Sequence, residues 1–296
     1  MKFLIIGHTV EDHIFYRGRN QQVKPGGIYY AAAGMHYFKS DEDEIFLASS
    51  IEDENYYLFR DVYDGINKKY LYKVPTIPKV HLNVFDNKER HEHYENITDK
   101  LEIDFSCLNE FDGIFINIVT GFDISAEDII NIRKHYSGKI YIDIHSLSRG
   151  LEPNYVRIFR SIPDVDKWLS SVDILQANEN EILTLSKYKD ELLIAKELFS
   201  HGIKIFINTK GDKGTTLISS EETGISVFDV PPINIKTENR IGCGDVFGAV
   251  FFYSYIKFGD KIKALNLANI AGGCIASYQN INQIKNLKED VFSRYT

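Results

Sequence analysis

The chain has 296 residues, 44% of them hydrophobic and 26% charged, and its 34 lysines and arginines against 42 aspartates and glutamates give a formal net charge of −8. This composition excludes disordered and low-complexity chains. The acidic balance argues against non-specific nucleic-acid binding, which depends on positive charge that neutralises phosphates. The length predicts one large α/β domain or two smaller ones.

The cysteines and the apolar runs favour a cytoplasmic protein. Cys107, Cys243 and Cys274 are odd in number and form no CxxC pair, which disfavours a disulfide framework and a structural zinc site. The apolar start at 2–7 is too short for a signal peptide, and no apolar run approaches the roughly 20 residues of a membrane span. We therefore expect neither a membrane nor a nucleic-acid partner.

The apolar pattern predicts strands that alternate with helices along the chain. Residues 2–7 form a continuous apolar run typical of a buried parallel strand, and further strands are expected at 44–49, 113–119, 139–144, 173–176 and 204–208. Helices are expected at 28–38, 53–63 (N-cap Asp53), 125–136 (cap Ser125), 179–185, 191–199, 244–257 and 261–277. Residues 215–219 and 225–230 read as a hairpin. This order predicts a doubly wound, mostly parallel sheet flanked by helices.

Residues 69–95 differ in character from the rest of the chain. They are rich in Val, Ile, His, Tyr and Thr, and 79–94 is typical of two strands around a turn at 86–88. We expect an antiparallel excursion outside the main sheet. His81, His91 and His93 raise the alternative of a metal site, but no fourth ligand is evident, which favours polar strand positions.

The most informative stretch is 239–249, with the sequence NRIGCGDVFGA. Gly242 and Gly244 bracket one small residue at the start of an apolar helix, where backbone N–H groups and the helix dipole favour an anion. Asp245 stands in the first turn, where its carboxylate is placed to accept a proton from a nucleophilic hydroxyl. The alternative, a glycine-rich turn with a capping Asp, stays open on this stretch alone.

This stretch resembles the second signature of the ribokinase-like (PfkB) carbohydrate kinases, Asp-Thr-x-Gly-Ala-Gly-Asp. Further segments resemble family features in the same order: IIGHTVED with Asp12, Pro25-Gly26-Gly27, the Asn-x-x-Glu motif at Asn178–Glu181, the loop at 208–214, and Ala268-Asn269. Each motif is weak singly, and five in order on the expected elements are specific. The resemblance covers nearly the whole chain.

The resemblance implies a role for each matched residue. Asp245 would be the base for the acceptor hydroxyl, the amides of Gly242, Cys243 and Gly244 would stabilise the transferring γ-phosphoryl group, and Glu181 would hold Mg²⁺ through water. Residues implied to bind the substrate are Asp12, Gly26, Gly27 and Arg149, and those implied to bind ATP are Asn178, Thr209, Gly211, Gly214 and Asn269. Whether the protein also binds a monovalent cation is left open.

The resemblance also implies the domain organisation. Residues 1–296 would form a single ribokinase-like α/β domain, with a small β-lid built from about 13–25 and 70–96. Closure of such a lid would exclude water, so that ATP phosphorylates the substrate rather than being hydrolysed. In several relatives the lid strands also form a dimer interface, so a homodimer through the lid is implied as an option.

The chain departs from the family pattern at several positions. Asn239-Arg240 replaces Asp-Thr, and Arg240 either contacts a phosphate or faces solvent. Cys243 replaces Ala, so it is either an oxidisable thiol with a lowered pKa at a helix N-terminus or a small side chain that fills a small space. Ala31 replaces an Asn that many sugar kinases use. Arg149 either reaches an anionic group of the substrate or forms a structural salt bridge.

The leading hypothesis is therefore an ATP-dependent kinase that phosphorylates a hydroxyl of a sugar or sugar-like molecule. A nucleoside kinase is the nearest alternative, with Tyr29 and Tyr30 stacking on a base. A non-catalytic relative that binds a ligand is a second alternative. A nicotinamide-dependent dehydrogenase is disfavoured because no GxGxxG follows the first strand.

Overall fold

A computed structural model describes residues 1–16, 19–84, 91–238 and 240–295, without the side chains of 16 and 19–21. The turn expected at 86–88, and Asn239 of the glycine-rich stretch, lie outside the described residues.

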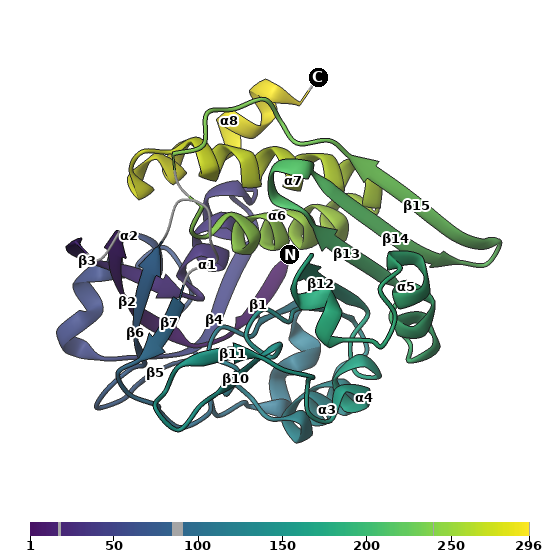
Figure 1. The fold of residues 1–296 in the computed structure, drawn as a ribbon. Coiled ribbons are helices and arrows are strands. Elements are labelled where there is room, and N and C mark those ends of the chain that lie inside the picture. The colour runs from purple at the N-terminus through teal and green to yellow at the C-terminus, as the bar shows by residue number, and fades with distance from the viewer. Residues whose placement is uncertain (17–18, 85–90, 239, 296) are drawn as a thin grey trace.

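A nine-stranded sheet forms the centre of the molecule (Figure 1). Its strands, in spatial order, are β15 (Gly224–Val230), β14 (Thr215–Glu221), β13 (Ile205–Thr209), β12 (Ile174–Asn178), β9 (Lys139–Asp143), β8 (Gly113–Asn117), β1 (Lys2–Ile6), β4 (Glu44–Ile51) and β5 (Leu71–Lys73). All neighbours pair in parallel except β14, which is antiparallel to both β13 and β15. The predicted mostly parallel sheet and its terminal hairpin are confirmed.

Helices cover both faces of this sheet, as its apolar strands require. One face is covered by α1 (Tyr29–Phe38), α6 (Cys243–Phe258), α7 (Lys261–Ser277) and α8 (Leu287–Arg294), and the other by α3 (Ala126–His135), α4 (Val165–Leu169) and α5 (Glu191–Ser200) (Figure 1). Each set packs on its own hydrophobic cluster. The doubly wound architecture is thus confirmed.

Several local expectations need correction. The region 53–63 is a 3₁₀ helix, η1 (Asp53–Leu58), followed by the single turn α2 (Arg60–Tyr63), and η1 begins at Asp53 after the capping position Glu52, so Asp53 is not the N-cap. Only a 3₁₀ turn, η3 (Glu181–Thr184), forms within 179–185. Further short 3₁₀ turns are η2 (Phe105–Glu110), η4 (Gly211–Lys213) and η5 (Ile281–Asn286). The C-terminal α8 was not predicted.

The predicted cap of α3 is confirmed. The Ser125 hydroxyl accepts from the N–H of Asp128, and the Asp128 carboxylate accepts from the N–H of Ser125 in return. Such a capping box satisfies backbone donors at the start of the helix.

A smaller four-stranded sheet stands beside the large one, in the order β3 (Arg19–Gly27), β2 (Thr9–Tyr16), β6 (Lys79–Val84) and β7 (His91–Tyr94) (Figure 1). Strands β2 and β6 are parallel, and the outer pairs are antiparallel. One face of this sheet buries Ile14, Val80, Leu82 and Tyr94. Strands β10 (Arg149–Leu151) and β11 (Arg157–Phe159) form a separate two-stranded ribbon that was not predicted.

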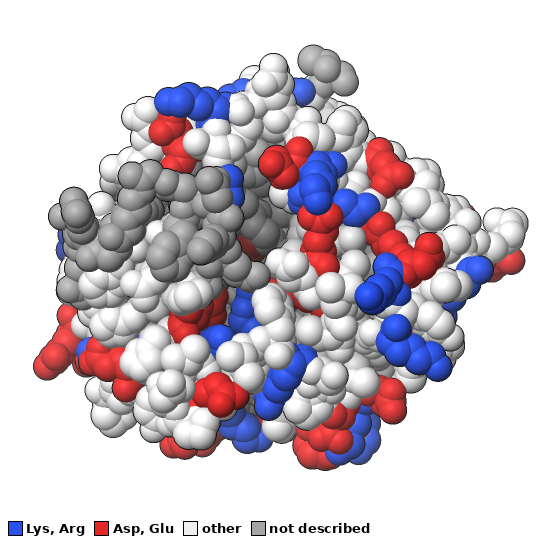
Figure 2. All heavy atoms as spheres, viewed as in Figure 1, with Lys and Arg blue, Asp and Glu red and all other residues white. Residues whose placement is uncertain are grey.

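The surface of the described residues carries mixed charge. Acidic and basic side chains are interspersed on the face shown in Figure 2. No helix among the described residues has both the length and the apolar character needed to cross a membrane. Within the same residues no group of His, Cys, Asp and Glu side chains is arranged to hold a metal ion, so His81 and His93 form no such site there.

Candidate active site

The glycine-rich stretch starts α6 against α1. Gly242 precedes the first turn of α6 with a φ of +81°, and a Cβ atom there would lie 2.1 Å from the ring of Tyr30. A residue with a side chain would therefore be strained in its backbone and would clash with the ring. This close approach brings the N-terminal amides of α6 to the C-terminal edge of the sheet, the usual place for ligands in open α/β sheets.

Asp245 is half-buried in the first turn of α6, and its side chain contacts the large sheet. The side-chain amide of Asn117, at the end of β8, donates to Oδ1 of Asp245 over 2.6 Å. Gln176 of β12 donates from Nε2 to the carbonyl oxygen of Gly244 over 3.1 Å. Gly244 and Asp245, at the start of α6, are thus each held by a side chain from the large sheet.

Asn117, Asp143 and Gln176 form one row across β8, β9 and β12. Asn117 is in register with Asp143, and Asp143 with Gln176, and all three side chains are buried. Gln176 also donates to Oδ2 of Asp143 over 2.8 Å and accepts from the Tyr141 hydroxyl. Burial, together with the charges of Glu181 and Asp245, raises the pKa of Asp143 well above its usual range.

Sequence reasoning missed Asn117 and Gln176. Their signal is a single amide side chain near the end of an apolar strand, in GIFIN and ILQAN. Because the carboxyl ends of parallel strands share one edge of the sheet, such residues converge on that edge.

The predicted acceptor side lies opposite Asp245. Asp12 is buried on β2, and a Cβ atom on Gly26 would lie 2.2 Å from its carboxyl carbon, so the carboxylate rests directly on Gly26. Burial raises the pKa of Tyr30 well above its usual value, and the charges of Asp12 and Asp245 add to the effect, which shows that the ring lies near both. Gly27 has a φ of +62° and turns the chain from β3 into α1.

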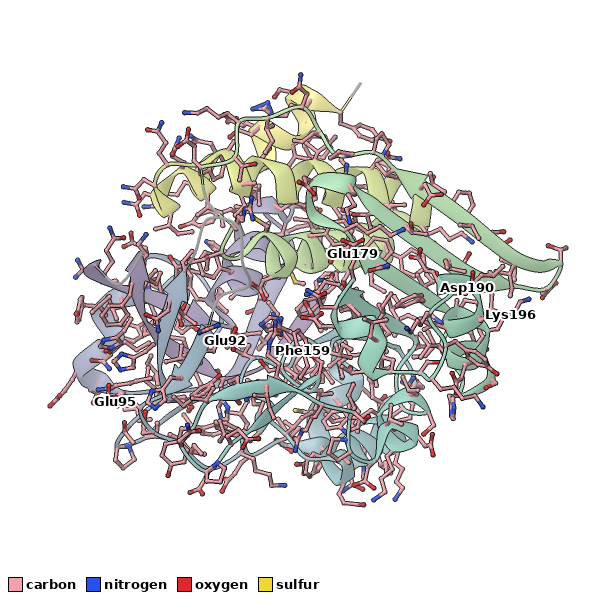
Figure 3. The ribbon with its side chains drawn as sticks, viewed as in Figure 1. Glu92, Glu95, Phe159, Glu179, Asp190 and Lys196 are labelled. Atoms are coloured by element: carbon pink, nitrogen blue, oxygen red, sulfur yellow. The ribbon has the colours of Figure 1, made fainter. Side chains whose placement is uncertain are left out.

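Glu181 lies at the centre of a buried polar cluster. Its Oε1 accepts from Nη1 of Arg149 over 3.2 Å and lies 2.8 Å from Nδ1 of His145, and its Oε2 accepts from the N–H of Asn178 over 2.9 Å. Burial alone would raise the pKa of Glu181, but these partners outweigh it and the pKa is lowered. The guanidinium carbon of Arg149 also lies over the ring of Phe159, 4.5 Å from its centroid. Phe159 is labelled in Figure 3. Arg149 thus forms a salt bridge with Glu181, and its contact with a substrate stays a prediction.

The residues predicted to bind the nucleotide meet around the turn after β13. Thr209 ends β13, and Gly211 and Gly214 have φ angles of +57° and +91°. A Cβ atom on Gly214 would lie 3.0 Å from the carbonyl carbon of Pro231, and Asn269 of α7 donates to the Pro231 oxygen over 2.9 Å. The segment after β15 therefore connects the two parts of the predicted nucleotide site.

The structure also bears on the alternatives left open at the positions that depart from the family pattern. Burial raises the pKa of the Cys243 thiol to about 12, so the idea of a lowered pKa is wrong. Arg240 is exposed to solvent. Tyr29 is buried against Phe59 and Tyr63, so it offers no free ring face to a base.

Comparison with known proteins finds similarity to carbohydrate kinases. Residues 144–286 match the pfkB family carbohydrate kinase. An uncharacterized sugar kinase of Archaeoglobus fulgidus is 27% identical over 178 residues, which are 60% of this chain and 66% of that protein. The match therefore spans just under two thirds of that relative.

Solved structures share the fold over nearly the whole chain. A pyrophosphate-dependent kinase in the ribokinase family superposes with a TM-score of 0.82 at 17% identity, over 97% of this chain and 99% of that one. The ribokinase of Arabidopsis thaliana, complexed with ribose and ATP, gives 0.76 at 14%, over 99% and 97%. A nucleoside kinase of Methanocaldococcus jannaschii gives 0.70 at 17%, over 99% and 98%. Just under half of the chain, residues 144–286, therefore matches the pfkB family of carbohydrate kinases, and the whole chain has the fold of ribokinase-family kinases.

Proposed function

We propose that the protein is a kinase that transfers the γ-phosphoryl group of ATP to a hydroxyl of a sugar or sugar-like molecule. In this proposal Asp245 takes the proton of the acceptor hydroxyl, and the amides of Gly242, Cys243 and Gly244 stabilise the charge on the phosphoryl group. Asp12 binds acceptor hydroxyls. The family assignment supports the reaction class, and the substrate and the roles are our inference.

One observation carries the proposal. The half-buried carboxylate of Asp245 stands in the first turn of a helix whose N-terminus packs at Gly242 against Tyr30, and the charges of Asp245 and Asp12 both act on Tyr30. The proposed base, the helix N-terminus and a second carboxylate for hydroxyl groups thus lie on one side of the molecule, around one tyrosine. Phosphoryl transfer needs mainly positioning and charge stabilisation, which this arrangement supplies.

Magnesium fits the chemistry of the site in one specific way. Mg²⁺ prefers oxygen ligands and is commonly held by one or two carboxylates, waters and the substrate's phosphates. Both Glu181 oxygens already have protein partners, which agrees with a contact through water rather than a direct bond. When bound, Mg²⁺ would neutralise phosphate charge. Asn178, Thr209, Gly211, Gly214 and Asn269 would hold the nucleotide.

The test is a screen for phosphorylated product with ATP and, separately, pyrophosphate as donors. Acceptors are aldoses, ketoses, inositols and nucleosides. We expect turnover of a polyol with ATP and Mg²⁺, and a fall of about 10²–10⁴ in kcat for Asp245→Asn, the range usual for a general base. A variant with unchanged kcat would refute the role of Asp245. Turnover with pyrophosphate alone would refute ATP as the donor.

A nucleoside acceptor is the second candidate, supported by the nucleoside kinase with the same fold. The burial of Tyr29 removes the base-stacking surface that first favoured it. Product from nucleosides but from no sugar in the same screen would establish this alternative.

We also propose that the smaller sheet closes over the site and that two chains pair through it in a homodimer. Light scattering that gives the mass of one chain would contradict the dimer.

A further inference from the structure

Asn117 contacts the carboxylate that the proposed function uses as the base. Its Nδ2 donates to Oδ1 of Asp245 over 2.6 Å, and the two residues are 128 positions apart in the sequence. Asn117 is fully buried at the end of β8, in a strand whose other residues are glycine, isoleucine and phenylalanine. The hydrogen bond therefore joins a rigid central strand to the first turn of α6.

The two ends of the Asn117 amide are used differently. Nδ2 donates a hydrogen bond to Asp245, whereas Oδ1 is buried without a hydrogen-bond partner among the described residues. A buried polar atom without a partner costs stability, and an apolar side chain of similar size would avoid that cost. Packing alone therefore does not explain an amide at this position. The hydrogen bond that the amide donates to Asp245 does explain it.

The same hydrogen bond distinguishes the two oxygens of Asp245. Oδ1 is held by Asn117, and among the described residues Oδ2 has no hydrogen-bond partner. A donor fixed on the sheet thus sets the rotation of the carboxylate about its χ2 angle.

We propose that Asn117 is a positioning residue that holds Oδ1 of Asp245 so that Oδ2 receives the acceptor's proton. This inference rests on the proposed function. In the step, the acceptor O–H bond breaks and its proton passes to Oδ2. The freed electron pair of the acceptor oxygen forms the new bond to the γ-phosphorus, and the bond between that phosphorus and the bridging oxygen of ATP breaks, with its electrons leaving on ADP.

The test is a double-mutant cycle on kcat with the acceptor found in the screen. Asn117→Ala should lower kcat about 10- to 100-fold, the effect of losing one hydrogen bond to a charged group, with KM for the acceptor changed less than threefold. In the Asp245→Asn background the same change should have almost no further effect, because Asn117 acts through that carboxylate.

Ile116→Val is the matched control, because Ile116 is the buried neighbour on the same strand and packs in the cluster on the opposite face of the sheet. It should leave kcat close to wild type. If Asn117→Ala does not fold, as judged by circular dichroism, Asn117→Ser replaces it, since the shorter hydroxyl does not reach Asp245.

The outcomes separate the two proposals. Equal losses from Asn117→Ala in both backgrounds indicate a structural role and overturn the inference, as does a variant with wild-type turnover, while the proposed function stands. A wild-type protein without turnover, or a fully active Asp245→Asn, overturns the proposed function and this inference with it.

Discussion

Replacing Arg149 with Met tests whether the buried ion pair with Glu181 is a structural element of the site. The two side chains are 7% and 2% exposed, and Nη1 lies 3.2 Å from Oε1. Removing one partner of a buried pair leaves an uncompensated charge and typically costs about 3–5 kcal/mol. His145 and the N–H of Asn178 still contact Glu181, so we expect a loss near the lower end, about 3 kcal/mol at pH 7.

The loss should depend on pH in a defined direction. In the wild type the pKa of Glu181 is lowered, so the pair's stabilisation is fully present above the unfolded value of about 4.3 and is lost as the pH falls through the folded value. In Arg149→Met one of the interactions that lower the pKa of Glu181 is lost, so this pKa rises relative to wild type and ionised Glu181 stabilises the fold less. The difference in stability between the two proteins should therefore be larger at pH 7 and above than at pH 4.5.

Urea unfolding at pH 4.5, 6 and 7.5 measures this difference directly. The double variant Arg149→Met/Glu181→Gln is the control, because neutralising both partners should bring the free energy of unfolding back to within about 1 kcal/mol of wild type. A free energy of unfolding that falls by less than about 1 kcal/mol at pH 7.5, or by the same amount at all three pH values, would show that the charge of Arg149 does not stabilise ionised Glu181 in the folded protein. A large rise in KM for an anionic acceptor with unchanged stability would assign Arg149 to the substrate instead.

Three further substitutions test the geometry of the site. Gly26→Ala places a methyl group on the Asp12 carboxylate, so KM for the acceptor should rise at least about tenfold in steady-state assays while kcat changes less. Gly242→Ala introduces a strained φ and a clash with Tyr30, so kcat should fall and the free energy of unfolding should drop by more than about 1 kcal/mol in urea. Cys243→Ala should keep kcat within about twofold, and the wild type should resist thiol alkylation at pH 8, because burial raises the thiol's pKa to about 12.

The order of the elements was predictable because buried parallel strands read as apolar runs. β1, β8 and β9 are such runs, and each lies in the large sheet where the pattern put it. The short elements were not predictable in the same way. α8 was missed because eight residues with a low apolar content carry little periodic signal, and their place depends on Leu287 and Val291 packing into the core.

The candidate site was predictable where its residues are close in sequence. Gly242, Gly244 and Asp245 form one local turn, so their spacing alone predicts that they come together at the start of a helix. The partners Asn117 and Gln176 come from two other strands, and only the register of the sheet brings them under α6. The pairing of Glu181 with Arg149 likewise joins residues 32 positions apart, so the local Asn-x-x-Glu motif gave no sign of it.

The distribution of charge bears on how the acidic edge of the sheet would accept the polyphosphate of the proposed reaction. Asp143, Glu181 and Asp245 lie close enough for their charges to interact, which at first sight opposes any anion. Burial favours the neutral form of Asp143, because its pKa is raised, and Arg149 balances the charge of Glu181. Asp245 is the member of this trio that stays half-exposed, in the first turn of α6. The phosphoryl group would therefore meet backbone N–H donors beside a single uncompensated carboxylate. That is the balance that base catalysis of phosphoryl transfer requires.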